Sequence, residues 1–165
     1  MSELDPALQS KRLPDMLPQF EYAFETRVIT GPVHSMDYGA GRRLMLTIEG
    51  GDISGPKLRG TILKGGVEWP TYRPDGVGMV DARYTFQSHD GVFINIHQRG
   101  YRRASPEVME RMNRLEWVEP TDYYIRTTPI FEAPPGPYGW LADHCFVGIG
   151  ERQPECLFMR YYIVL

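Results

Sequence analysis

The sequence predicts an all-β protein, an antiparallel sheet that closes into a β-barrel, with one short α-helix near residues 106–116. Apolar and polar residues alternate along several segments, as they do in strands that bury one face. The chain contains 17 glycines and 14 prolines, many of which separate these segments as turn signals. Its 10 tyrosines and 7 phenylalanines also favour strands. Short strands at regular spacing are typical of a meander or barrel.

The individual strands follow from the alternation and from the turns that interrupt it. Turns are expected at Gly31-Pro32, Gly50-Gly51 and Gly65-Gly66, where no regular element continues easily. The expected strands, in chain order, are residues 20–29, 42–48, 58–63 and 67–70, a hairpin over 81–100, and residues 123–131, 140–149 and 157–164.

One helix is predicted after the hairpin. Ser105 is a good N-cap residue, Pro106 suits the first helical position, and Glu107 complements the positive end of the helix dipole. The helix is expected to run to about Leu115 or Trp117, because Pro120 prevents its extension.

The chain length fits one domain. At 165 residues and 19.0 kDa, a single core is large enough to be stable without disulfides or metal. Residues 20–165 are expected to form the barrel domain, and residues 1–19 an extended arm, because Pro6, Pro14 and Pro18 disfavour a regular element. Arms of this kind often lie across a partner subunit, so a homo-oligomer is expected.

Composition argues against several classes of protein. The net charge is -3, and the 18 basic residues are spread along the chain, so neither nucleic acid nor a membrane surface is expected as a partner. The N-terminus lacks the pattern of a secretory signal, and no apolar run approaches the ~18 residues of a membrane span. A cytoplasmic location is therefore expected. Cys145 and Cys156 lack metal-ligand spacing and are interpreted as reduced core residues.

The hairpin over residues 81–100 has two possible registers. A two-residue turn at Asp90-Gly91 brings Tyr84 opposite His97 or its close neighbours. A three-residue turn at 89–91 instead gives three polar cross-strand pairs, Asp81 with Arg99, Arg83 with His97, and Thr85 with Asn95. The second register is favoured because it separates polar from apolar residues. Alternation alone leaves open which face lines the barrel interior.

Short motifs in a specific order carry a family resemblance. They are Gly41-Arg42-Arg43, Gly50-Gly51 with Gly55-Pro56, Gly65-Gly66 with Trp69, Asp75-Gly76, Asp81-Ala82-Arg83-Tyr84-Thr85, Asp90-Gly91, Arg99-Gly100, Tyr124 with Arg126-Thr127, Phe131-Glu132, Tyr138 with Trp140-Leu141, and Val147-Gly148. From about Phe20 to Leu165, the chain resembles the domain of unknown function 3237, also called uncharacterised protein family 0311. The resemblance implies a lipocalin-like (calycin-like) antiparallel barrel and does not imply a reaction.

Two residues depart from the pattern of that family. Glu68 replaces an aspartate before Trp69, and Ala142 replaces an asparagine after Trp140-Leu141. If these positions line the pocket, the resemblance implies a substrate different from those of related chains.

The polar residues of the hairpin and of the strand at 123–131 are candidates for a pocket of mixed polarity. The candidate catalytic residues are Asp81 or Glu132 as base, Arg83 or Arg126 as anion stabiliser, and His97 or Tyr84 as acid. The candidate substrate-binding residues are Trp69, Asn95, Arg99, Tyr124, Arg126, Tyr138 and Trp140. The competing interpretation is a solvated face, on which Asp81 and Arg99 form a surface pair worth only ~0.2–1 kcal/mol.

These residue types favour cofactor-independent acid/base chemistry. The four histidines are scattered without metal-ligand spacing, and neither a nucleophile elbow nor a phosphate-binding glycine loop is present, so no metal or cofactor is expected. The prediction is a lyase, isomerase or cyclase that acts on a carbonyl-containing, apolar or aromatic small molecule. The alternative is a lipocalin-like binding protein, which needs no carboxylate or histidine with a perturbed pKa. A purely structural oligomer would have no cavity.

Overall fold

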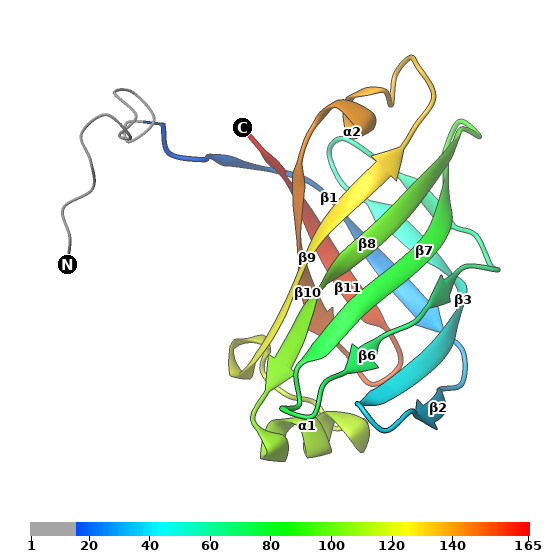
Figure 1. The fold of residues 1–165 in the computed structure, drawn as a ribbon. Coiled ribbons are helices and arrows are strands. Elements are labelled where there is room, and N and C mark those ends of the chain that lie inside the picture. The colour runs from blue at the N-terminus through cyan, green and yellow to red at the C-terminus, as the bar shows by residue number, and fades with distance from the viewer. Residues whose placement is uncertain (1–15) are drawn as a thin grey trace.

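The computed structural model describes residues 16–165, and in these residues all strands belong to one antiparallel sheet (Figure 1). The strands are β1 (Phe20–Thr30), β2 (His34–Asp37), β3 (Arg42–Ser54), β4 (Gly60–Ile62), β5 (Val67–Glu68), β6 (Thr71–Tyr72), β7 (Gly78–Ser88), β8 (Phe93–Ala104), β9 (Tyr123–Glu132), β10 (Phe146–Arg152) and β11 (Leu157–Val164). The helices are α1 (Pro106–Asn113), the short 3-10 helix η3 (Pro120–Asp122) and α2 (Trp140–Asp143).

The sheet closes on itself through β1. This strand pairs with β11 on one side, where Glu25 lies opposite Arg160, and with β3 on the other, where Glu25 lies opposite Ser54. Between β3 and β7, the short strands β4, β5 and β6 share one position in the wall, and β2 pairs only with β3. The barrel is therefore closed and antiparallel, as the sequence predicts, and it has eight strand positions within the described residues.

The expected turn at Gly50-Gly51 is wrong, because β3 continues through both glycines to Ser54. Ile29 pairs with Gly50 while Thr30 pairs with Ile48, so Glu49 is the extra residue of a β-bulge. A Cβ on Gly51 would lie only 1.9 Å from the carbonyl oxygen of Arg27. The glycines thus allow a bent strand to approach β1 closely.

Helix α1 lies across one end of the barrel (Figure 1) and begins as predicted. The Ser105 hydroxyl accepts a hydrogen bond from the Val108 N–H at 3.2 Å, and Pro106 is the first helical residue. The helix ends at Asn113, earlier than expected. Leu115 has a left-handed φ of 59°, which is incompatible with a further helical turn.

The strand expected over residues 140–149 begins later, because Trp140 lies on α2 and not on a strand. The reason is the preceding turn, in which the Gly139 N–H donates to the Gly136 carbonyl at 3.1 Å. Two further hydrogen bonds continue this turn, from the Leu141 N–H to the Tyr138 carbonyl and from the Ala142 N–H to the Gly139 carbonyl. Strand pairing therefore starts only at Phe146.

Aromatic side chains fill one half of the barrel interior. The Phe24 ring centroid lies 4.9 Å from that of Tyr161 and 6.1 Å from that of Phe86, and Phe131 lies 4.9 Å from Phe146. These side chains are almost fully buried. Such edge and tilted contacts stabilise the core beyond the burial of apolar area. The other half, beneath α1, has a different lining.

Other predictions concern the chain end and the cysteines. Both cysteines are free thiols, but only Cys156 is buried, whereas Cys145 is exposed and not in the core.

The predicted arm, residues 1–19, lies mostly outside the described residues, and the homo-oligomer stays a prediction. None of the helices within residues 16–165 is long and apolar enough to cross a membrane.

Candidate functional site

The turn between β7 and β8 has the three-residue form. The Ser88 N–H donates to the Val92 carbonyl at 2.9 Å, and Gly91 has a left-handed φ of 89°. The predicted pairs follow from this turn, with Asp81 opposite Arg99, Arg83 opposite His97, and Thr85 opposite Asn95. The favoured register is therefore confirmed.

Burial identifies which face of this hairpin lines the interior. Ala82, Tyr84 and Phe86 on β7 and Ile94 and Ile96 on β8 are buried, so the alternate residues face outward. Of the five candidate catalytic residues, the structure places Tyr84 inside the barrel and the other four on its outer surface, namely Asp81, Arg83, His97 and Glu132. The expectation that these four share an enclosed pocket is thus corrected.

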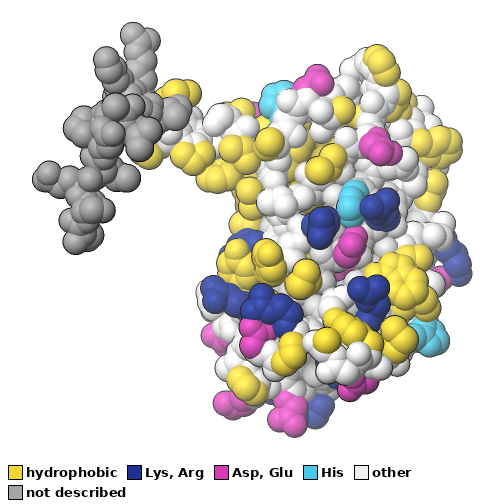
Figure 2. Space-filling model, in the orientation of Figure 1, with side chains coloured by type: hydrophobic (Ala, Val, Ile, Leu, Met, Phe, Trp, Pro, Cys, Tyr) yellow, Lys and Arg dark blue, Asp and Glu magenta, His cyan; other side chains and the backbone are white. Residues whose placement is uncertain are grey.

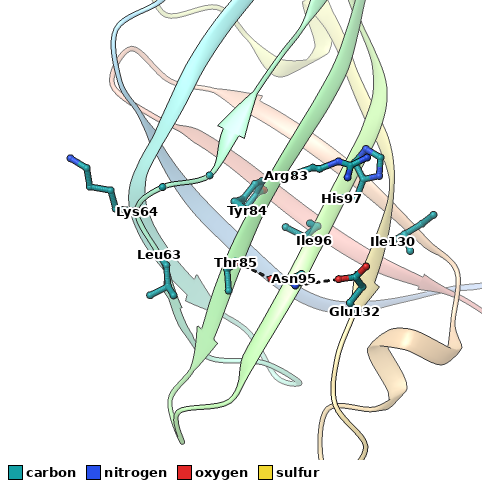
Figure 3. Close-up of a pocket in the computed structure, with 12 residues that line it drawn as sticks. Leu63, Lys64, Arg83, Tyr84, Thr85, Asn95, Ile96, His97, Ile130 and Glu132 are labelled. Carbon is teal, nitrogen blue, oxygen red and sulfur yellow. Dashed lines mark hydrogen bonds between the residues drawn. The ribbon is translucent and has the colours of Figure 1, made fainter.

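Three of these outer residues, Arg83, His97 and Glu132, nevertheless line a common hollow of about 520 Å³ across β7, β8 and β9 (Figure 3). The Thr85 hydroxyl donates to Asn95 Oδ1 at 2.8 Å, and Asn95 Nδ2 donates to Glu132 Oε2 at 3.2 Å. His97 Nε2 lies 2.9 Å from Asp81 Oδ1. Figure 2 shows basic and acidic side chains close together on this face of the molecule. The hollow is open to water, where such pairs stabilise little and electrostatics are screened.

The remaining candidate binding residues lie in separate places. Trp69 follows the inward-facing Glu68 and is 46% exposed, and Arg99 is also exposed on the outer surface. The exposed ring of Tyr124 lies between two guanidinium groups, those of Arg103 and Arg126, each 5.0 Å from the ring centroid.

Tyr138 and Trp140 lie near α2 (Figure 1). The Tyr138 hydroxyl donates to Asp90 Oδ1 at 2.7 Å, and the Trp140 ring packs 5.9 Å from that of Phe146. Both contacts hold parts of the protein together and involve no pocket shared with the other candidates. Predicted binding residues therefore do not converge on one site.

A cavity of about 190 Å³ occupies the barrel interior beneath α1. We call it the chamber. Its apolar wall includes Val80, Ile125 and Met159. Its polar lining includes five residues at inward positions of four strands: Glu68 on β5, Gln98 and Arg102 on β8, Thr127 on β9, and Arg152 on β10. An apolar pocket with a few convergent polar groups is the usual form of a small-molecule site.

A pair of buried tyrosines contacts Gln98, one of the polar residues of the chamber, through the hydroxyl of Tyr161. The Tyr161 hydroxyl donates to Gln98 Oε1 at 2.6 Å and lies 3.4 Å from the Tyr84 hydroxyl. Burial raises the pKa of Tyr161 to about 12 and raises the pKa of Tyr84 well above its ordinary value. Both phenols therefore stay protonated at neutral pH.

Glu68 lines the chamber, and the residue as a whole is half-buried. Burial raises its pKa, and the positive charges of Arg102 and Arg152 only partly oppose this shift. Burial, together with the charge of Arg102, lowers the pKa of Arg152. Among residues 16–165, no basic side chain forms an ion pair with Glu68 within 4.0 Å. The carboxyl therefore takes up a proton more readily than an exposed glutamate does.

Two buried polar atoms of the chamber have no hydrogen-bond partner in the described part of the chain. They are Nε of Arg102 and the hydroxyl oxygen of Thr127. The Arg102 guanidinium makes one weak contact through Nη2, which lies 3.9 Å from the sulfur of Met112. Because buried polar groups are nearly always satisfied, these two are candidates for ligand contacts.

Sequence reasoning placed Tyr84 among the catalytic candidates but included none of the chamber residues among the catalytic or binding candidates. Gln98 and Arg102 occupy the same alternation as Ile94 and Ile96, so polar residues at apolar positions were an available signal. Glu68 stood out as a departure from the family pattern, and it does line the chamber, unlike the exposed Ala142. For Thr127 and Arg152, no signal in the single sequence distinguished inward from outward positions.

Within residues 16–165, no three residues of the types His, Cys, Asp and Glu are grouped closely enough to hold a metal ion.

Comparisons with known proteins agree with this fold. The family model described as protein of unknown function (DUF3237) matches residues 18–164. The chain is 37% identical over 122 residues to a UPF0311 protein of Clostridium acetobutylicum, which covers 74% of this chain and 77% of that protein. It is 34% identical over 157 residues to a hydroalkoxylation enzyme of Penicillium herquei, covering 94% of this chain and 88% of that enzyme.

Among solved structures, a conserved protein of unknown function from Rhodopseudomonas palustris superposes with a TM-score of 0.85 at 29% identity, covering 91% of this chain and 99% of that one. The family resemblance predicted from the order of motifs is confirmed. The chain belongs to the DUF3237 family of proteins of unknown function.

Proposed function

We propose that this chain is a cofactor-independent acid/base enzyme whose reaction takes place in the chamber. The single observation that carries the proposal is a carboxyl of raised pKa, Glu68, in the same enclosed cavity as two arginines, Arg102 and Arg152. A carboxyl whose pKa is shifted toward neutrality can take and return a proton near physiological pH. The arginines supply positive charge where a carbonyl oxygen becomes negative.

The reaction class that we favour is the addition of a hydroxyl group to a carbon–carbon double bond conjugated to a carbonyl. The similarity to a protein named as a hydroalkoxylation enzyme supports this class, because that relative matches most of the chain. The same groups suit the reverse elimination and the related isomerisations.

The proposed step balances within the substrate and the chamber residues. Ionised Glu68 takes the proton of the substrate hydroxyl, the oxygen forms a bond to the distal alkene carbon, and the π electrons move onto the carbonyl oxygen. Arg102 and Arg152 stabilise the resulting enolate. Protonated Glu68 then returns its proton to the carbon beside the carbonyl. An O–H and a π bond are replaced by a C–O and a C–H bond, so no electrons are gained or lost.

The interior of the chamber suits this step better than the outer hollow. Inside the barrel the effective dielectric is low, so fixed charges act more strongly on a developing oxyanion than they do in water. On the outer surface, the carboxylates of Asp81 and Glu132 already contact His97 and Asn95, respectively.

An ortho-hydroxyphenyl propenyl ketone is a suitable probe, because its hydroxyl adds to its own alkene to give a chiral methylchromanone. We expect the full chain to accelerate this closure and to give one enantiomer in excess. Glu68→Gln keeps the size of the side chain and removes the base, so kcat falls by about 10²-fold or more.

Glu25→Gln is the matched control, because Glu25 lies on the outside of β1, paired with Arg160. It should leave rate and enantiomeric excess unchanged. Wild-type rate and enantiomeric excess in Glu68→Gln would contradict the proposal, and so would a loss confined to Glu132→Gln, which would move the site to the outer hollow. Binding of the ketone without acceleration would instead favour the non-catalytic ligand-binding alternative.

A further inference from the structure

We infer that the chamber binds its substrate as a delocalised organic oxyanion of about one aromatic ring in size, with the anionic oxygens between Arg102 and Arg152. The shared chemistry is that of a carboxylate or of an acidic phenol or enol. The inference rests on the proposed function in that it names the substrate class of the same chamber.

The first argument is an imbalance of charge. Arg102 and Arg152 line the chamber and Arg42 also borders it, whereas Glu68 is its single carboxyl within the described residues. None of these arginines has a carboxylate within 4.0 Å in that part of the chain. Even with Glu68 ionised, the arginines outnumber it, which leaves the chamber with net positive charge.

The contacts that these arginines do make are weak or neutral. Arg102 has an unpartnered Nε, Arg152 Nη1 donates to the Cys156 carbonyl at 3.0 Å, and the Arg42 guanidinium lies 5.3 Å from the Tyr72 ring centroid. By contrast, Arg160 on the outer surface donates to a carboxylate, that of Glu25. Since buried charges are normally paired, the arginines of the chamber lack an anion that a ligand can supply.

The two half-buried arginines, Arg102 and Arg152, also affect each other. The charge of Arg102 contributes to the lowered pKa of Arg152, which means that the two guanidinium groups are close enough to repel. An oxyanion between them would relieve this repulsion. Arginine suits such a ligand, because its planar fork binds carboxylate-like oxygens in a bidentate manner.

Size and hydrogen-bonding groups narrow the ligand further. The volume of about 190 Å³ exceeds only slightly the roughly 150 Å³ of an engineered apolar cavity that accepts benzene. The apolar side chains of Val80, Ile125 and Met159 offer contacts to a ring. The buried, unpartnered hydroxyl of Thr127 offers a further hydrogen bond to an anionic oxygen.

The chamber is accessible from outside near the end of α1. Val33, Arg42 and Leu115 border it and are exposed. A positive side chain at an opening raises the local concentration of anions and speeds their entry. Arg42 is therefore placed to favour the same ligands as the interior.

The inference is tested by calorimetric titration of the full chain with benzoate, its neutral isostere benzamide, and para-nitrophenol, whose ionised form absorbs visible light. We expect benzoate to bind at least about 10-fold more tightly than benzamide, or nitrophenol to be bound as the coloured phenolate at a pH where the free compound is mostly neutral. The first result identifies a carboxylate ligand and the second an acidic phenol. Equal affinity for benzoate and benzamide, with nitrophenol bound in its neutral form, would overturn the inference.

Variants locate the anion. Arg102→Met is expected to weaken binding of the preferred anion at least about 10-fold and to leave benzamide unaffected. Arg152→Met tests the same loss of anion affinity independently if Arg102→Met does not fold. Arg103→Met is the matched control, because the neighbouring Arg103 faces outward onto Tyr124. An anion affinity unchanged in both interior variants would refute the assignment.

The outcomes separate this inference from the proposed function. Anion binding that depends on Arg102, without closure of the hydroxyphenyl ketone, would support the inference and refute the enzyme. Closure that depends on Glu68, without any preference for anions, would support the enzyme and refute the inference.

Discussion

The hydrogen bond from Tyr161 to Gln98 predicts a measurable loss of stability when one partner is removed. Tyr161 is fully buried, its hydroxyl lies 2.6 Å from Gln98 Oε1, and its ring packs against Phe24. Tyr161→Phe keeps the ring and deletes only the hydroxyl, so the amide oxygen of the buried Gln98 loses its donor. Leaving a buried acceptor unsatisfied costs about 1–3 kcal/mol. For a chain of this size, that corresponds to a Tm lower by roughly 2–12 °C.

The assay is a double-mutant cycle in urea, with Tyr161→Phe, Gln98→Leu and the double variant. Each single variant leaves one buried polar group without its partner, whereas the double variant removes both groups. We therefore expect the double variant to lose less stability than the sum of the two single losses. The matched control is Tyr124→Phe, because the exposed Tyr124 ring lies on the outside, and its loss should stay within about 0.5 kcal/mol.

Two results would refute this reasoning. One is a loss for Tyr161→Phe no larger than that for Tyr124→Phe, which would mean that the hydroxyl makes no net contribution. The other is strict additivity in the cycle, which would mean that the two side chains do not interact in the folded protein.

Three further predictions concern stability. The folded state raises the pKa of Glu68 above its ordinary 4.5, so the stability linked to its protonated form is full below pH 4.5 and is lost as pH rises through the folded pKa. Tm measured from acid to alkaline pH should therefore fall less in Glu68→Gln than in the wild type. Parallel curves of Tm against pH for the two proteins would contradict this prediction. Thr127→Val removes an unpartnered buried hydroxyl at nearly constant volume, so we expect a gain of roughly 1 kcal/mol in urea and weaker anion binding, whereas a loss of stability would reveal an existing partner. Gly65→Ala should lower stability by roughly 1–3 kcal/mol because of the φ of 115° alone. Gly51→Ala should lower stability more, because its Cβ also meets the Arg27 carbonyl. Similar losses of stability in the two variants would argue against that close approach.

The barrel was predictable because its signals are local. Alternation, glycine turns and the Ser105 cap act over a few residues, and they located most strands and the start of α1. The exceptions arise where local signals conflict with long-range pairing. Gly50 and Gly51 read as a turn, yet pairing with β1 keeps both in a strand.

The candidate site was harder to predict, because alternation defines two faces without saying which is inside. Both faces of β8 carry polar residues: Asn95 and His97 on one, Gln98 and Arg102 on the other. Only closure of the sheet decides between them. Glu68 illustrates the same limit, since the two-residue strand β5 is too short to show alternation.

The three-residue turn at 89–91 fixes the division between the outer hollow and the chamber, and it has a consequence for engineering. The same strands supply both surfaces through alternate side chains, so neighbouring positions such as Gln98 and Arg99 can be varied for unrelated purposes. A library aimed at substrate preference should sample every second residue of β8 and leave the positions between them for solubility or assembly. Deleting one residue from the turn would exchange the two sets and lose both properties together.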